Sequence, residues 1–260
     1  VDNCLYMVER FGRVLNSNKK KWSSRSQLPF LTSMIQLVHD NYPDHSWLNY
    51  AMNIALKEYE GYWCSGSHIM GIGLSRFYED SGDNYMTRHT EVSWDMSPRY
   101  DDDDTTDLAP VDLNANLYLY ETHFAEHFER AGNPKMAEVF REKAHARKAL
   151  ITKLMWNPDA GLFFDYNVAW QKQKTIKSLA SFIPLWVGLA DKTQASKVAA
   201  NLALFEHEYG LATCDQDYGY SDRQWNYPYG WAPLHWMVYH GLKSYGYQEA
   251  AYRIAEKWLM

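Results

Sequence analysis

The sequence has 260 residues, of which 46% are hydrophobic, 16% aromatic and 22% charged, and this composition excludes a disordered chain, a collagen-like repeat and a small disulfide-stapled protein. The net charge of −6 comes from 26 Lys and Arg against 32 Asp and Glu. Because the basic residues are dispersed and no apolar run approaches the roughly 20 residues of a membrane span, we expect neither a nucleic-acid surface nor a transmembrane segment.

Apolar residues recur along the chain at intervals of three and four, which is the period of an α-helix. Stripes begin at Leu28 and Leu48, and a third runs from Leu113 to Ala131, followed by Gly132 as a helix stop and by a proline in the first turn of the next helix. Further helices are predicted over residues 134–155, 178–190, 193–207, 232–245 and 247–259. These segments pair into four predicted helical hairpins.

The connections between the hairpins, at residues 61–111, 156–177 and 208–231, are long and rich in glycine and aromatic residues. Long connections inside a compact domain are usually functional. We therefore predict an all-α toroid of helical hairpins, a single domain over residues 1–260, with these loops gathered at one end. Because the chain starts without Met and ends at Met260 inside an uncapped apolar helix, we expect the domain to be truncated at one or both ends.

Cysteine usage bears on the compartment of the protein. The three cysteines, Cys4, Cys64 and Cys214, are far apart in the sequence, which is typical of neither a disulfide framework nor a zinc site. We expect a soluble protein in a reducing compartment, with the cytoplasm favoured.

Aromatic residues are unusually abundant, with 11 Trp, 20 Tyr and 10 Phe, and they concentrate between Gln224 and Trp236. In this stretch Trp225 and Trp231 stand among proline and glycine, so a bent backbone presents flat rings beside the amides of Gln224 and Asn226. Rings that stack on sugar faces and planar groups that bind hydroxyls are what a carbohydrate site needs. The alternative is the buried start of an aromatic helix.

Two further stretches carry polar groups in apolar surroundings. Asp95 stands between Trp94 and Met96, a setting that would raise the pKa of its carboxyl and keep a proton available, with Arg99 able to offset this or to hold a substrate hydroxyl. As an alternative, Asp95 caps the turn that follows it. The third stretch, residues 25–30, offers Arg and Gln donors at a helix start, where an ordinary capped N-terminus is the alternative.

Together the three stretches resemble the trehalase family of glycoside hydrolases and its clan relatives, the glucosidase I and mannosylglycerate hydrolase group. Residues 224–233 are similar to the signature Gln-Trp-Asp-x-Pro-Asn-Gly-Trp-Ala-Pro, from which Asn226 and Tyr229 depart. Residues 91–95 look like Glu-Ser-Gly-Trp-Asp, and residues 25–30 look like Arg-Ser-Gln-Pro-Pro-Phe. The family's Arg-Pro-Glu-Ser block is not visible; residues 85–89 are a poor substitute for it.

The resemblance implies an incomplete (α/α)6 barrel and an inverting glycosidase that needs no cofactor and no metal. Inversion requires a protonated acid and a carboxylate base about 6.5–9.5 Å apart, with a water between the base and the sugar. By its position in the motif, Asp95 would be the general acid. The substrate-binding residues implied are Arg25, Gln27, Trp94, Arg99, Gln224, Trp225, Asn226 and Trp231.

The general base is expected to be a Glu beyond Met260, because in the family it follows the Trp-rich signature by several tens of residues. Glu206, Glu208, Asp215 and Asp217 match no family block. The expected substrate is a small α-linked glucoside such as trehalose. Mannosylglycerate, glucosylglycerate or α-gluco-oligosaccharides stay open as alternatives, and so does a noncatalytic carbohydrate-binding protein.

Two metal-binding alternatives also follow from the sequence. Residues 123–127 fit the pattern H-x-x-E-H, so a zinc peptidase could use His123 and His127, although both flank an apolar stripe and are expected as ordinary helix histidines. The run Asp101–Asp104, with Asp107, could bind calcium, although a solvated acidic loop is the simpler interpretation.

Overall fold

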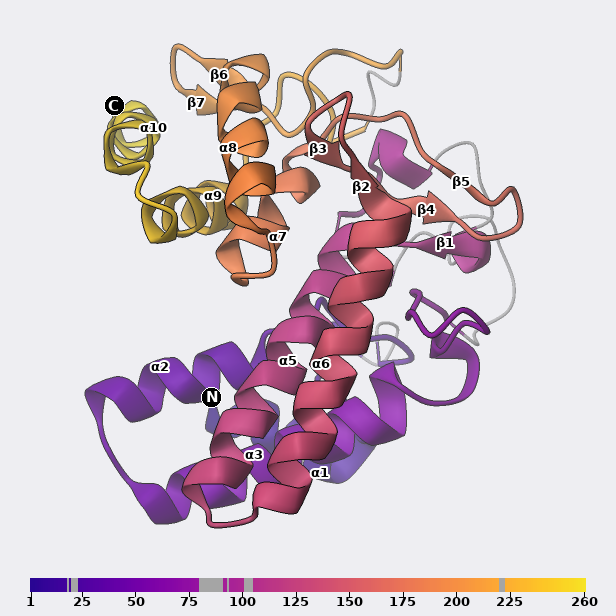
Figure 1. The fold of residues 1–260 in the computed structure, drawn as a ribbon, viewed down its shortest axis with the longest axis vertical. Coiled ribbons are helices and arrows are strands. Elements are labelled where there is room, and N and C mark those ends of the chain that lie inside the picture. Colours follow the sequence, from indigo (N-terminus) through magenta and orange to yellow (C-terminus); the bar gives the residue numbers. More distant parts are fainter. Residues whose placement is uncertain (18, 20–22, 80–90, 93, 101–104, 220–222) are drawn as a thin grey trace.

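The structure is a computed structural model that describes residues 1–17, 19, 23–79, 91–92, 94–100, 105–219 and 223–260. Helices dominate the described residues (Figure 1), which confirms the predicted all-α fold class. The α-helices are α1 (Asp2–Phe11), α2 (Leu31–Asn41), α3 (His45–Glu58), α5 (Val111–Arg130), α6 (Pro134–Met155), α7 (Ile183–Trp186), α8 (Lys192–Ala200), α9 (Ala232–Ser244) and α10 (Gln248–Leu259). A π-helical turn over Tyr59–Trp63 extends α3.

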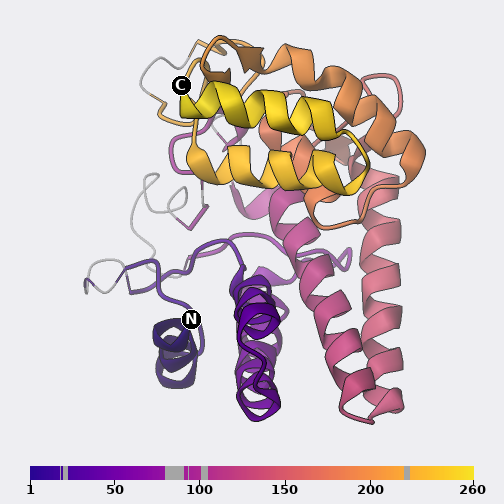
Figure 2. The same cartoon turned by 90° about the vertical axis from the view of Figure 1, so that its left-hand side faces the viewer.

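Three pairs of helices that follow one another in the sequence pack side by side. α5 and α6 form the long pair in Figure 1, and α9 and α10 lie side by side in Figure 2; α2 and α3 form a further pair. At the α5–α6 turn, Gly132 takes a φ of 73°, which favours glycine. The side chain of Asn133 then accepts from the Met136 N–H at 3.2 Å, and Pro134 occupies the first turn. The predicted stop and start are confirmed at this turn.

The helices predicted over residues 178–190 and 193–207 are wrong in extent. A 3-10 helix over Leu179–Phe182 leads into the short α7, because Pro184 has no N–H to donate and is tolerated only in a first turn. The chain then leaves the helix at Gly188, which has a φ of 69°. α8 ends at Ala200, and α7 packs chiefly against α5 and α9.

The first helix and the short strands were not predicted. α1 buries only Leu5 and Val8, against α3, so its apolar stripe is brief. The strands lie in the long connections and pair antiparallel in the order β1–β4–β5, β2–β3 and β6–β7. They are β1 (Leu108–Ala109), β2 (Trp156–Asn157), β3 (Leu162–Phe163), β4 (Tyr166–Asn167), β5 (Lys172–Gln173), β6 (Glu206–His207) and β7 (Gly210–Leu211). Two residues are too few for an alternating pattern to be seen in a sequence.

α2, α5, α7 and α9 form a row in which each helix contacts the next. Buried apolar side chains run along this row, among them Ile35, Leu117, Phe182 and Val238. The motif-bearing segments lie before the N-termini of three of these helices: residues 25–30 lead into α2, residues 94–100 precede α5, and residues 224–231 lead into α9. From here on the motifs are numbered in chain order, as the first (residues 25–30), the second (residues 91–100) and the third (residues 224–236). The row therefore positions the motifs at the end where these helices begin.

Glu58 links three parts of the N-terminal half through buried hydrogen bonds. Its carboxylate accepts from the Val14 N–H at 3.1 Å and from the Tyr120 hydroxyl at 3.0 Å. That hydroxyl in turn accepts from the Leu31 N–H, at the start of α2, at 2.8 Å. Burial raises the pKa of Glu58 from 4.5 to about 7, although the hydrogen bonds from Val14 and Tyr120 oppose the rise.

The raised pKa of Glu58 predicts a pH-dependent stability. Between about pH 4.5 and about pH 7 the folded chain holds a proton that the unfolded chain has lost, so the free energy of unfolding should decrease as the pH rises through this range. Glu58→Gln should remove this contribution, as measured by urea unfolding at a series of pH values. A variant with the same slope as the wild type would show that Glu58 does not cause it.

Candidate active site

Asp95 lies in a turn that a second motif holds in place. Met96, the next residue, has a φ of 56°, a left-handed conformation that is strained for a residue other than glycine. Its carbonyl oxygen accepts from the Trp225 N–H at 3.4 Å, which ties the turn to the segment before α9. Asp95 is half-buried, and burial raises the pKa of its carboxyl above the ordinary value, while its own backbone N–H and the charge of Arg25 oppose the rise.

Arg25 lies among carboxylates close to this turn. Its side chain is 2% exposed and its Nη1 donates to the Oε2 of Glu79 at 3.2 Å. Burial lowers the pKa of Arg25, and the negative charges of Glu79, Asp95 and Glu91 work against this. The first and second motifs therefore meet in space, with the guanidinium near enough to Asp95 for the two charges to interact.

Glu91 joins the segments on which these groups lie. Its carboxylate is 1% exposed and accepts from the Ser26 N–H at 3.2 Å, from the Tyr78 N–H at 2.6 Å and from the Tyr62 hydroxyl. The Nε2 of His68 lies 2.9 Å from the same carboxylate. Ser26 follows Arg25 and Tyr78 precedes Glu79, so one buried side chain holds the backbone on both sides of the Arg25–Glu79 pair.

The tryptophans of the two aromatic motifs form a stack. The rings of Trp94 and Trp225 lie 5.3 Å apart at 21°, and those of Trp225 and Trp231 lie 4.2 Å apart at 3°. The guanidinium carbon of Arg99 lies 4.4 Å from the centre of the Trp94 ring. The three rings, which we call the tryptophan column, stand on Arg99 and connect the second motif to the third.

Four of the predicted substrate contacts are buried in this structure and lie against other side chains of the chain. Arg99 is 0% exposed and its guanidinium is bound to Asp112 and Asp165, so a sugar hydroxyl cannot reach it in this structure. The Trp94 ring contacts Arg99 and Trp225, the Trp225 ring contacts Trp94 and Trp231, and the two residues are 2% and 9% exposed. Asn226 is also 0% exposed, and its Nδ2 donates to Asp217 at 2.9 Å.

The remaining predicted residues are accessible or adjoin an accessible group. Gln27 and Gln224 are exposed, and Trp231 and Asp95 are half-buried. The indole N–H of Trp231 donates to the carbonyl oxygen of Gln224 at 2.9 Å, which keeps these two motif residues together. Among the contacts of the described residues, Gln27 makes none with the other predicted site residues. Fewer of the predicted site residues are therefore exposed than the motifs suggested.

Several supporting residues were missed at the sequence level. Tyr62, His68, Tyr78 and Glu79 lie between the first and second motifs and belong to no motif, so no local pattern marks them. Glu91 opens the second motif, and only that position could have drawn attention to it.

The carboxylates considered as bases within the chain have other surroundings. Glu206 binds Arg253 and Lys257, and these hydrogen bonds lower the pKa of its carboxyl to about 2. Asp215 accepts from the Tyr218 hydroxyl, and Asp217 is bound to Asn226. Glu208 is exposed beside β6. None of these side chains contacts the Asp95 turn among the described interactions.

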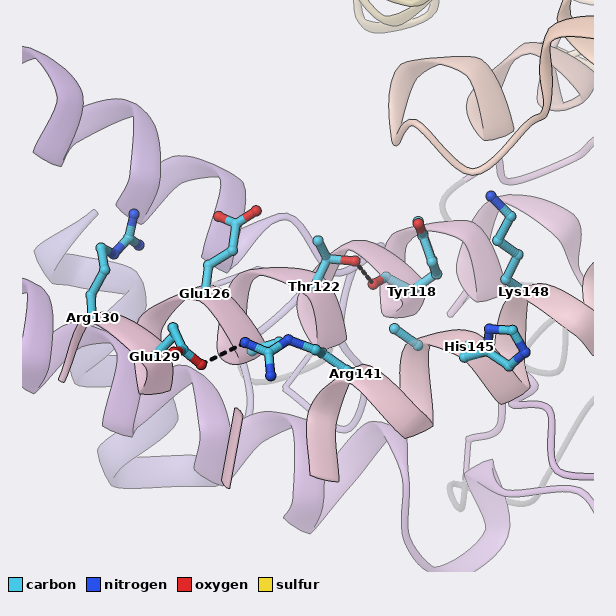
Figure 3. A pocket seen from close by; sticks show the side chains of 10 residues that line it. Tyr118, Thr122, Glu126, Glu129, Arg130, Arg141, His145 and Lys148 are labelled. Atoms are coloured by element: carbon cyan, nitrogen blue, oxygen red, sulfur yellow. Dashed lines mark hydrogen bonds and ion pairs between the residues drawn. The ribbon is translucent and has the colours of Figure 1, made fainter. Parts of the chain in front are cut away.

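The H-x-x-E-H residues do not converge on one point. Glu126 lines a groove of about 590 Å³ between α5 and α6 (Figure 3), whereas His123 lines a groove bounded by α2, α5, α7 and α9. His123 is bound through Nδ1 to the Thr32 hydroxyl at 3.1 Å, and His127 is buried against the ring of Phe128. In the described part of the chain, no group of three or more His, Cys, Asp or Glu side chains is arranged to hold a metal ion.

Three other expectations concern residues or properties that the structure addresses only in part. Asp101–Asp104, the proposed calcium run, and residues 85–89, which replace the Arg-Pro-Glu-Ser block, lie outside the described residues. Among the helices that are described, none combines the length and the apolar character required to cross a bilayer.

The fold and the site together define a class. Helical hairpins whose connecting loops bring an aspartate, an arginine and stacked tryptophans together place the chain in the α/α-toroid class of folds. The family model described as Trehalase matches residues 1–82 and 76–260, so the chain belongs to the trehalase family. The two matched pieces meet at residues 76–82, directly before the stretch that lacks the Arg-Pro-Glu-Ser block.

Curated relatives agree with the family. The cytosolic neutral trehalase of Saccharomyces cerevisiae is 29% identical over 328 aligned residues, which cover 100% of this chain and 44% of that protein. The periplasmic trehalase of Citrobacter koseri is 30% identical over 306 residues, which cover 100% of this chain and 53% of that protein. The chain therefore spans about half the length of the curated relatives it matches.

Solved structures confirm the toroid. The neutral trehalase of S. cerevisiae matches with a TM-score of 0.87 at 28% identity, over 98% of this chain and 59% of that one. The mannosylglycerate hydrolase of Thermus thermophilus in complex with glucose matches with a TM-score of 0.73 at 17% identity, over 93% of this chain and 68% of that one. The second likeness concerns the fold alone.

Proposed function

We propose that the protein containing this chain is an inverting glycoside hydrolase that cleaves trehalose, with Asp95 as its general acid. The observation that carries the proposal is the setting of Asp95, half-buried with a raised pKa, in a turn whose neighbouring residues Trp94 and Met96 both contact Trp225. A carboxyl that keeps its proton can supply it to a leaving oxygen. The curated relatives named as trehalases support trehalose in preference to the alternative α-glycosides.

In the proposed reaction, Asp95 protonates the glycosidic oxygen as the bond from that oxygen to the anomeric carbon breaks. A water molecule attacks the anomeric carbon from the opposite face and gives its proton to a base, through an oxocarbenium-like transition state. We propose as base a Glu beyond Met260, because the carboxylates considered within the chain are engaged elsewhere or lie apart from the Asp95 turn. Two carboxyl groups and a water suffice, so the reaction needs no cofactor.

Substrate binding is assigned to Gln27, Gln224 and Trp231, which are exposed or half-buried, and to Arg25, which is buried but lies near enough to Asp95 for their charges to interact. Gln27 and Gln224 can exchange hydrogen bonds with sugar hydroxyls, and Arg25 can do so beside Asp95. Trp231 ends the tryptophan column and is partly exposed, so it is the ring best placed to contact a sugar.

The compartment proposed is the cytoplasm. The three cysteines are unpaired, which suits a reducing compartment, and cytosolic neutral trehalases are among the relatives. Periplasmic trehalases are also among them.

The test is the hydrolysis of trehalose, mannosylglycerate, glucosylglycerate and gluco-oligosaccharides by the longest natural form of the protein, with the anomers followed by NMR. Inversion at one ring of trehalose yields one β-glucose, while the other ring leaves as α-glucose, so the two anomers should appear initially in equal amounts. Release of α-glucose alone would contradict inversion. Binding of the sugar without turnover would favour the noncatalytic carbohydrate-binding alternative.

Trp231→Ala should weaken binding of the sugar by about 1–3 kcal/mol, by analogy with the stacking of bases on aromatic rings. The measurement is the inhibition constant of glucose or an unreactive trehalose analogue. Trp170→Ala is the matched control, since Trp170 is 53% exposed at the turn between β4 and β5 and should leave the constant unchanged. Equal affinity in both variants would remove Trp231 from the sugar site.

A further inference from the structure

The side chain of Arg99, which precedes α5 in the chain, is bound to two carboxylates beside the first turn of α5. Its Nη1 and Nη2 donate to the two oxygens of Asp112 at 3.1 and 2.9 Å, and its Nε and Nη2 donate to the two oxygens of Asp165 at 2.8 and 2.7 Å. The side chains of Arg99, Asp112 and Asp165 are 0%, 0% and 5% exposed. Both carboxylates also accept backbone N–H groups of the first turn of α5, from Leu113 and Val111 respectively. Paired forks of this kind fix the plane of a guanidinium.

The tryptophan column packs on the guanidinium plane of Arg99. Trp94 rests on the guanidinium, Trp225 on Trp94 and Trp231 on Trp225. Asp95 is the residue after Trp94, and the carbonyl of Met96 is bound by the N–H of Trp225. The backbone of Asp95 is therefore fixed on both sides. Before it, the Trp94 ring stacks in the column, and after it, the carbonyl oxygen of Met96 accepts from the Trp225 N–H.

We infer that Arg99 is a positioning residue: clamped by Asp112 and Asp165, it holds Trp94 and so sets where the Asp95 carboxyl lies relative to the half-buried ring of Trp231. The inference rests on the proposed function, because this position matters for turnover only if Asp95 delivers a proton. A general acid must lie within hydrogen-bond reach of the leaving oxygen, and a displacement of about 1 Å can cost roughly 10²-fold in rate.

The test compares Arg99→Lys with Arg147→Lys in the longest natural form of the protein. Lysine keeps the positive charge between the carboxylates but loses the planar fork and the flat surface under Trp94. Arg147 is the matched control because it is also buried, at 5% exposure, and bound to Glu121 at 2.8 Å, yet it touches no ring of the column. Thermal unfolding reports how much stability each variant loses.

Two readouts separate positioning from a merely structural role. Arg99→Lys should lower kcat for trehalose on the order of 10- to 100-fold with little change in KM. It should also weaken the circular-dichroism couplet of the stacked indoles. Trp225→Phe, which removes one indole from the stack, assigns this couplet. Arg147→Lys should lower the melting temperature while kcat and the couplet stay at the wild-type level. A wild-type kcat and couplet in Arg99→Lys, or equal losses in both variants, would overturn the inference.

A second variant covers the case in which Arg99→Lys does not fold. Trp225→Leu replaces the middle ring of the column, which is 9% exposed, by another apolar side chain and should lower kcat in the same way. A wild-type kcat there would also overturn the inference. If the wild-type protein hydrolyses none of the glycosides, the proposed function fails, whereas the couplet still decides whether Arg99 orders the column.

Discussion

Asp95→Asn is expected to lower kcat for trehalose on the order of 10²- to 10⁴-fold while the fold and the affinity for the sugar are retained. Asparagine has the shape of aspartic acid but no proton of suitable acidity, so the glycosidic oxygen would leave unprotonated. The measurement is kcat beside the melting temperature and the affinity for an unreactive sugar. Turnover at the wild-type level would exclude Asp95 as the acid.

The role of Asp95 as general acid also predicts how kcat/KM depends on pH. Because a general acid must be protonated, kcat/KM should fall as the pH rises through the pKa of Asp95, which burial raises above the ordinary aspartate value. The Asp95→Asn variant should lack this alkaline limb. Glu208→Gln is the control, since Glu208 is an exposed carboxylate beside β6 and its loss should leave both kcat and the limb unchanged.

Glu91→Ala is expected to destabilise the fold by about 3–5 kcal/mol, the range typical of breaking a buried charged network. It leaves the N–H of the buried Ser26 and that of the half-buried Tyr78 without the acceptor they have now. Activity should fall as well, because the segments that hold Arg25 and Glu79 lose their common anchor. Urea unfolding measures the free-energy change.

The control for Glu91 is an exposed glutamate in an ion pair. Glu129 binds Arg141 on the surface of the α5–α6 pair (Figure 3), with the two side chains 54% and 46% exposed. Solvent screens such pairs, so Glu129→Ala should leave the unfolding curve close to that of the wild type. Equal destabilisation by the two substitutions would mean that the buried hydrogen bonds of Glu91 add nothing.

Most of the helical organisation could be predicted, because the signals are local. The stripe that ends at Ala131, the glycine after it and the proline that follows describe the α5–α6 turn completely. The segment around α7 could not be predicted in the same way, because its apolar residues continue through a proline and a glycine that interrupt the helix. Burial between α5 and α9 explains those apolar residues without a long helix.

The site was predictable in composition but not in arrangement. Asp95 and its apolar neighbours could be picked out from residue types alone, and the raised pKa follows from them. The residue type of Arg99 and its distance from Asp95 in the sequence are the same whether its side chain binds a sugar or a carboxylate. Its partners Asp112 and Asp165 lie 13 and 66 residues away in the chain, so only the fold shows that its donors are engaged.

The sequence by itself determined the helical period, the three motifs, the family they resemble and the proposed identity of the acid, because each depends on residues close together in the chain. The tertiary structure decided which motif residues face outward and which support them. Trp94, Trp225 and Asn226 are buried against other side chains, and the Glu91 carboxylate accepts from the backbone N–H of Ser26, next to Arg25. The physical reason is that burial and stacking are set by partners distant in sequence, and a local pattern does not contain them.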